Sequence, residues 1–405
     1  MKIKSLVLAM SFAAVSSVAS AGDYNAEAAA APVDNSMFQS TIDGMNQVGG
    51  RYDTGLGPDW TKYVSIHGGL FTDAAFGSRQ SLAGENNQRL SLTDGYVAVQ
   101  ATPNDWAKFD LTVNYSNAGD NYGNATDNGD EVFVDQAYLT IGNEDHYPVF
   151  FQAGKQYAPF GHYDLFPVSK SLGQVLTETN QTEVQLGFVV PKGLYGSVYT
   201  FQNDVPKDVG DSKPYNWGAA LGFQQANEMI SFNAGVGYLA NMTGVQSVQD
   251  YVNNTGDYAD NLGGAHAYGT EVDALAPYIS VKKGAFGLDL DYVTALTHFD
   301  AATLPNEVNS TSGAQPAAFD SKLSYNFNKH DMDQQVFVGY QMSEEASALD
   351  IPEQRVAAGY NVYPWKNVMF GFQVNRDSEY SDSHVGNYSN GDDYYSYNLR
   401  AGVQF

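Results

Sequence analysis

Residues 393–405 read DYYSYNLRAGVQF, and every second residue of this stretch is apolar or aromatic. Tyr395, Leu399 and Val403 fall on one face, whereas polar residues such as Asn398 and Arg400 fall on the other. A period of two is typical of a β-strand with one apolar face. Roughly ten such residues suffice to cross a bilayer as a tilted strand. The stretch therefore predicts a membrane-spanning strand.

The same alternation recurs along the chain, and the connections between the repeats are alternately short and long. The short ones, among them 103–105, 191–193 and 364–366, have the Pro, Gly, Asn and Asp chemistry of tight turns and recur after every second strand. We therefore predict an all-β transmembrane antiparallel β-barrel of about 16 strands, with short periplasmic turns and long extracellular loops. The expected strands are 63–72, 89–102, 106–116, 131–142, 147–157, 183–190, 194–203, 215–225, 229–241, 272–283, 285–296, 318–328, 333–343, 353–363, 367–377 and 393–405.

Alternating strands would also permit a large soluble β-sandwich. Two stretches favour the barrel, because their apolar faces extend over a full membrane span. These are Phe109 to Tyr115 and Val368 to Val374. A sandwich strand is usually nearer five or six residues long.

The first residues have the layout of a secretory signal peptide, with Lys2 and Lys4 before an apolar run and Ala19-Ser20-Ala21 after it. We expect residues 1–21 to be removed. The apolar run is too short to span a bilayer as a helix.

Residues 22–62 differ from the rest, because apolar residues recur there at helical spacing over 36–48. We predict a short periplasmic N-terminal segment with a helix, followed by a barrel over 63–405. The alternative is that this segment enters the barrel as a small plug.

Composition excludes several classes of function. The chain has 46 acidic against 20 basic residues, a net charge of −26, so a nucleic-acid partner is not expected. It has no cysteine, which excludes disulfides and thiolate metal sites. The seven histidines show neither metal-ligand spacing nor a nucleophile signature beside them. We therefore predict no catalytic residue, no metal site and no cofactor, and place an enzyme last.

The barrel wall can be divided into two faces, because a charge facing lipid at mid-bilayer costs roughly 2–4 kcal/mol whereas one in a watery lumen does not. The inward charges are then balanced, and the acidic excess falls in the long connections. Those carboxylates either bind lipopolysaccharide through divalent cations or form a negative vestibule that attracts cations. The predicted pore-lining residues are Lys108, Asp110, Glu183, Lys282, Asp289, Asp291, Asp320, Lys322, Arg355 and Arg400.

A barrel of this size leaves an aqueous channel unless a connection folds inward. Two connections are long enough to do so, 158–182 and 242–271. The first mixes aromatic, basic and acidic groups that suit an oxygen-rich ligand. Its alternative role is a packed loop that narrows the pore without specificity. The candidate constriction residues are Phe160, His162, Tyr163, Asp164 and Lys170.

Three stretches carry a family resemblance: VDQAYL at 134–139, GKQYAPFG at 154–161 and YNLRAGVQF at 397–405. The chain resembles the LbtU-type siderophore porin family, iron-uptake outer-membrane proteins of gamma-proteobacteria. The resemblance implies a plug-free barrel that takes up a ferric siderophore or another iron source. A strand ending in Phe405 also resembles the signal read by the outer-membrane assembly machinery.

We therefore expect a channel in the outer membrane of a Gram-negative cell, in contact with outer-membrane lipid and lipopolysaccharide, with ferric siderophore as its solute. Its aromatic faces are compatible with a homotrimer. The alternatives are a general cation-preferring diffusion porin and, from a different class, a surface-binding barrel with a sealed lumen. Negative loops oppose an anionic siderophore unless wall residues such as Lys108, Lys322, Arg355 and Arg400 cluster around it.

Overall fold

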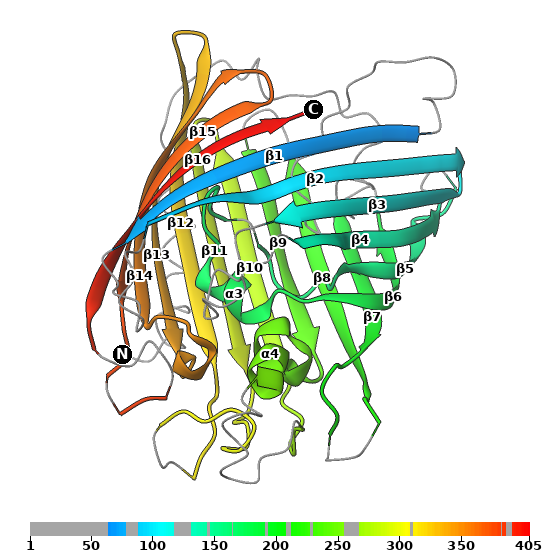
Figure 1. Ribbon diagram of the computed structural model, residues 1–405. Coiled ribbons are helices and arrows are strands. Elements are labelled where there is room, and N and C mark those ends of the chain that lie inside the picture. The colour runs from blue at the N-terminus through cyan, green and yellow to red at the C-terminus, as the bar shows by residue number, and fades with distance from the viewer. Residues whose placement is uncertain are drawn as a thin grey trace.

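The chain forms a closed β-barrel of sixteen antiparallel strands, each paired with its sequence neighbours and β1 paired with β16 (Figure 1). The computed structural model describes residues 64–77, 88–116, 131–143, 146–163, 165–190, 193–207, 212–226, 230–254, 267–307, 311–381, 383–385 and 391–405. The expected signal peptide 1–21 and N-terminal segment 22–62, with its helix at 36–48, lie outside these residues. The closed barrel confirms the predicted fold and rules out the sandwich.

The strands follow the chain in order, and every predicted strand is present. They are β1 (Val64–Gly77), β2 (Gln88–Asn104), β3 (Ala107–Ser116), β4 (Glu131–Gly142), β5 (Val149–Tyr157), β6 (Asn180–Val189), β7 (Leu194–Gln202), β8 (Tyr215–Ala226), β9 (Ile230–Leu239), β10 (Ala274–Lys283), β11 (Phe286–Ala295), β12 (Ala317–Lys329), β13 (Met332–Glu344), β14 (Gln354–Trp365), β15 (Val368–Ser378) and β16 (Asp393–Gln404).

Several boundaries differ from the sequence prediction, the largest difference being β1, which extends to Gly77 rather than residue 72; two other differences have local reasons. β6 begins at Asn180 rather than Glu183, because the polar start of this strand gives no apolar signal although Asn180 already pairs with Tyr157. β9 ends at Leu239 rather than two residues later. There the Asn241 side chain accepts a hydrogen bond from the Thr243 amide, which starts a short 3-10 helix in place of further strand.

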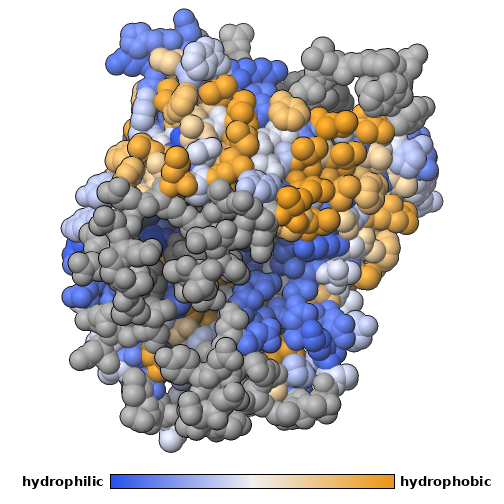
Figure 2. Space-filling model, viewed as in Figure 1, coloured by the Kyte–Doolittle hydropathy of each residue, from blue (hydrophilic) through white to orange (hydrophobic). Residues whose placement is uncertain are grey.

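The outer wall exposes large apolar side chains at alternate positions. On β16, Tyr395, Leu399 and Val403 are between 42% and 48% exposed, as their alternation predicts. Hydrophobic side chains gather in broad patches on the wall, on the right of the view over the first strands (Figure 2). Contiguous apolar surface of this kind needs a partner, and in a closed barrel that partner is the hydrocarbon of a bilayer.

None of the helices in the described part of the chain has the length and hydropathy that a membrane-crossing helix needs.

The seam between β1 and β16 is closed by backbone and side-chain bonds. Gly68 and Phe405 exchange two backbone hydrogen bonds of 3.0 and 2.9 Å. Further along the same pair of strands, Asp73 lies opposite Arg400 and binds its guanidinium through both carboxylate oxygens, at 2.8 and 2.7 Å. The seam is therefore held by backbone hydrogen bonds between the two strands and by a bidentate ion pair between Asp73 and Arg400.

Glycine is required at position 154 of β5. Its φ of +140° is a conformation that residues with a side chain rarely adopt, and an added Cβ would lie 2.2 Å from the carbonyl oxygen of Ala137 on β4. Gly154 pairs with Tyr138 of β4 on one side and with Glu183 of β6 on the other, so its backbone is held by both neighbouring strands.

We expect Gly154→Ala to lower the free energy of unfolding by about 1–3 kcal/mol, the usual cost of a strained backbone position. Urea unfolding of the barrel in detergent micelles, followed by tryptophan fluorescence, measures this change. Gly95→Ala is the matched control, because its nearest neighbour would lie 3.4 Å from the added Cβ and its φ is ordinary. Equal stabilities of the two variants would contradict the assignment.

Candidate functional site

The connection between β5 and β6 folds into the barrel interior and carries the short helix α3 (Leu172–Thr177). We call residues 158–179 the inward segment. Its apolar side chains are buried, among them Phe160, Leu172 and Leu176. Ser171 caps α3 by accepting a hydrogen bond from the Gln174 amide at 3.2 Å. The segment therefore packs against the inner face of the barrel wall.

Cations on three alternate strands of the wall hold the backbone of the inward segment. Each binds a wall carboxylate and also donates a hydrogen bond to a carbonyl oxygen of the segment. They are Arg400 on β16 (Asp73, and Pro167 O at 2.8 Å), Arg355 on β14 (Asp377, and Lys170 O at 3.4 Å) and Lys322 on β12 (Asp289, and Leu165 O).

Asp320 on β12 holds the start of α3. Its two carboxylate oxygens accept hydrogen bonds from the amides of Leu172 and Gly173, at 3.1 and 2.8 Å, and the side chain is only 1% exposed. Gln341 accepts a second bond from Leu172 at 2.9 Å. The free amides at the start of a helix attract a carboxylate. Asp320 is thus used to position the segment.

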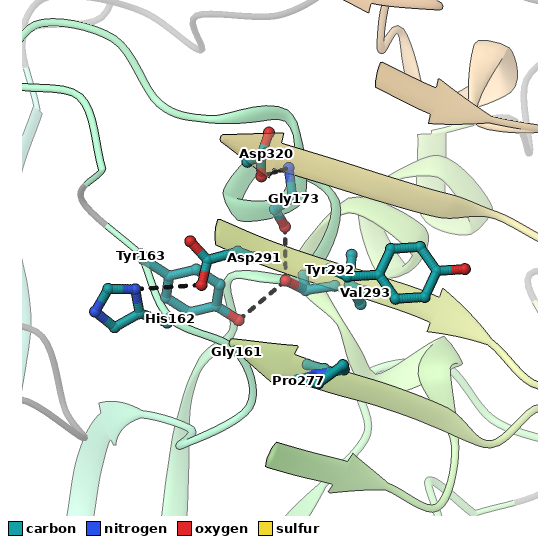
Figure 3. Close-up of a pocket in the computed structure, with 11 residues that line it drawn as sticks. Gly161, His162, Tyr163, Gly173, Pro277, Asp291, Tyr292, Val293 and Asp320 are labelled. Carbon is teal, nitrogen blue, oxygen red and sulfur yellow. Dashed lines mark hydrogen bonds and ion pairs between the residues drawn. The ribbon is translucent and has the colours of Figure 1, made fainter. Parts of the chain in front are cut away.

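His162 joins the first part of the inward segment to the wall (Figure 3). Its Nδ1 lies 3.2 Å from Oδ1 of Asp291 on β11, and its ring stacks on Tyr278 of β10 with centroids 4.8 Å apart. Burial lowers the pKa of His162, the Asp291 and Asp289 carboxylates raise it, and the net shift is upward. The small pocket behind this contact is lined by Gly161, His162, Tyr163, Gly173, Thr177, Ala276, Pro277, Asp291, Tyr292, Val293 and Asp320.

The second long connection covers α3 from the extracellular side. It contains the 3-10 helix η2 (Met242–Gly244) and the helix α4 (Gln246–Asn254). Val245 and Val248 belong to one buried apolar cluster with Leu172 and Leu176 of α3, and a further short helix, η3 (Ser347–Leu349), contributes to it. The side of the lumen next to this cluster is therefore filled with apolar side chains.

The remaining predicted pore and constriction residues lie as follows. Asp110 and Glu183 are buried on inward-facing positions and accept hydrogen bonds from Gln100 and Gln156, at 2.9 and 2.7 Å. Lys108 and Lys282 occupy inward positions of β3 and β10 by register. Phe160 is buried, Tyr163 donates to Thr177 Oγ1 at 3.1 Å, and Lys170 pairs with Glu178 at 2.5 Å. Asp164 lies outside the described residues.

Three functional residues escaped the sequence prediction. Asp73 lies one residue beyond the expected end of its strand, so it was not placed on the wall. Asp377 falls on the polar face of an expected strand, and alternation could have found it. Gln373, whose amide donates to Ser169 Oγ at 2.5 Å, carries no charge and gives no signal.

The described residues contain no group of three or more His, Cys, Asp or Glu side chains placed to hold a metal ion.

No family model matches the chain. It is 24% identical over 331 residues to a UPF0422 protein of Coxiella burnetii, covering 81% of this chain and 67% of the relative. It is 25% identical over 260 residues to a UPF0422 protein of Legionella pneumophila, covering 63% of this chain and 48% of the relative. The chain therefore spans about half the length of its Legionella relatives.

Solved outer-membrane channels share the fold. The channel DcaP of Acinetobacter baumannii superposes with a TM-score of 0.54 at 14% identity, covering 84% of this chain and 97% of DcaP. Salmonella typhi OmpF gives 0.56 at 11% identity, covering 84% and 97%, and Pseudomonas putida OprB gives 0.55 at 11%, covering 85% and 95%. The chain thus has the closed β-barrel fold of these outer-membrane channels.

We expect Arg400→Gln to release the middle of the inward segment and to increase single-channel conductance and current noise. The variant leaves Asp73 partly buried without its cation, so the free energy of unfolding should also fall, by about 3 kcal/mol. Planar-bilayer recordings and urea unfolding measure the two effects. Arg376→Gln is the control, because its ion pair with Asp393 is half exposed and lies on the face of β15 opposite to Asp377. Unchanged conductance in Arg400→Gln would show that the segment does not depend on this anchor.

Proposed function

We propose that this protein is a diffusion channel for small hydrophilic solutes, with a preference for cations, narrowed by the inward segment. The observation that carries the proposal is how the charges of the lumen are used. The cations Lys322, Arg355 and Arg400 are each bound to a carboxylate and to the segment. Cations that are neutralised in this way offer little attraction to anions.

A carboxylate on the opposite side of the lumen supports a preference for cations. Asp94 on β2 accepts a hydrogen bond from Asn114 at 3.1 Å. A neutral amide satisfies an oxygen but leaves the negative charge in place. A passing cation would therefore meet a field that favours it.

The extracellular mouth adds to the same field. Each of the three lysines in the described parts of the outer loops is paired with a carboxylate: Lys170 with Glu178, Lys207 with Glu271 and Lys213 with Asp204. Further carboxylates, such as Asp300, Glu307 and Glu353, remain in these loops in excess. Electrostatic focusing raises the local concentration of cations at such a mouth.

Uptake of a ferric siderophore is the more specific proposal that the family resemblance implies. An anionic siderophore would need basic wall residues around it, and three of those expected for this role are engaged by the inward segment. This electrostatic argument does not apply to a neutral or cationic siderophore, which needs no basic residues around it. The homotrimer and the binding of lipopolysaccharide also remain predictions.

We expect the wild-type channel to show a reversal potential of cation-selective sign in a potassium chloride gradient. Asp94→Asn should lower the cation-to-anion permeability ratio by roughly fivefold, since one charge interaction of about 1 kcal/mol corresponds to that factor. Asp333→Asn is the matched control, because this exposed carboxylate at the start of β13 also accepts an amide bond, from Asn328.

Titration with a ferric siderophore in the same recordings separates the proposals. Block by the siderophore, reversed on its removal, would support substrate-specific uptake, whereas indifference would favour general diffusion. If the refolded barrel conducts no ions, both transport proposals are contradicted and the surface-binding barrel is favoured.

A further inference from the structure

The first part of the inward segment is tied to the wall by a group that can lose its charge near neutral pH. His162 lies 3.2 Å from Asp291 and stacks on Tyr278, as Figure 3 shows for the ion pair. The anchors of the next part, Lys322, Arg355 and Arg400, are an ammonium and two guanidinium groups, whose ordinary pKa values lie far above neutral. These three cations keep their charge between mildly acidic and mildly alkaline pH, whereas the imidazole of His162 can lose its proton in that range.

The charges around His162 explain why its proton matters. Asp291 and Asp320 lie directly opposite each other in the register of β11 and β12, and both are at least nine-tenths buried. Asp320 is satisfied by the amides of α3, and the neighbouring Asp289 by Lys322. Neither oxygen of Asp291 accepts a hydrogen bond from the described residues, so its balance depends on the imidazolium of His162.

The groups that face His162 from the elements packed against it are Asp289 and Asp291 of β11, Asp320 and Lys322 of β12, Tyr278 of β10, and Tyr163 of the segment itself. Carboxylates outnumber cations in this set. Loss of the imidazolium charge would leave a buried carboxylate facing another carboxylate, which is costly in a poorly solvated site.

We propose that the His162–Asp291 pair is a protonation-dependent latch that holds residues 158–163 against β10 and β11, so that this part of the lumen loosens and widens as the pH rises. Gly161, with φ of +99°, provides a hinge beside the latch. The three permanent cations keep residues 165–170 in place, so the movement is local.

The direction follows from the sign of the pKa shift. The pKa of His162 is raised in the folded barrel by Asp291, against the opposing effect of burial. Because the pKa is raised, the pair stabilises the docked segment to its full extent at pH values below the ordinary pKa of histidine. This stabilisation is lost as the pH rises through the pKa that His162 has in the folded barrel.

A cysteine reporter on the wall tests the latch without any measurement of ion flow. Ala276 on β10 is 2% exposed and lines the pocket behind His162, and the chain has no cysteine of its own. Labelling of Ala276→Cys in detergent micelles with a small thiosulfonate reagent reports how often residues 158–163 move away. Its rate is divided by that of Ser212→Cys in an exposed loop, which corrects for the ionisation of the thiol.

We expect the corrected rate of the latch-intact reporter to rise roughly tenfold between about pH 5.5 and about pH 8.5, as one pKa unit of differential interaction corresponds to a factor of ten. His162→Gln in the reporter background should label fast at both pH values. Asp291→Asn should behave in the same way and serves as the second variant if the first does not fold. A corrected rate that is independent of pH in the latch-intact reporter overturns the proposal.

The inference goes beyond the proposed function and can fail separately from it. If labelling detects the latch but the barrel conducts no ions, the latch proposal is supported and the channel proposal is contradicted. If the barrel shows a cation-selective conductance but the labelling rate does not depend on pH, the channel proposal is supported and the latch proposal is contradicted.

Discussion

The cost of leaving a charge unpaired inside the barrel governs the arrangement of the lumen. Arg355 and Asp377 are almost fully buried, and each needs the other. A guanidinium has five donors, however, and one carboxylate cannot accept them all. The spare donors of the two wall arginines reach the carbonyls of Pro167 and Lys170. The path of the inward segment therefore follows from the need to satisfy charges that the wall already carries.

The apolar cluster acts with these polar anchors rather than in place of them. Burial of Leu172 and Leu176 against α4 gives the segment a non-directional attraction to one side of the lumen. Hydrogen bonds to Asp320 and to the wall cations then fix its height and direction. The position of the segment along the barrel axis therefore depends on these directional contacts more than on apolar burial.

The strands and their faces could be predicted from the sequence, because alternation is a local property and each membrane span is long enough to show it. Inward positions such as Asp289 and Arg355 follow from the same rule. Their partners could not be predicted. Arg400 and Asp73 are 327 residues apart, and no local pattern relates them. Helix α3 has only six residues, too few for a periodic signal, and its Asp320 partner lies 148 residues away from Leu172.

The seam between β1 and β16 has a consequence for biogenesis. Fifteen of the strand pairs join neighbours in sequence and can form one after another, but this pair joins the first strand to the sixteenth. Until β16 arrives, the edge of β1 has unsatisfied amides and carbonyls that a bilayer does not tolerate. The machinery that inserts the barrel would have to shield that edge until β16 is in place. A chain that ends before β16 would stay an open sheet. Closure of the barrel therefore waits for β16, the last strand along the chain.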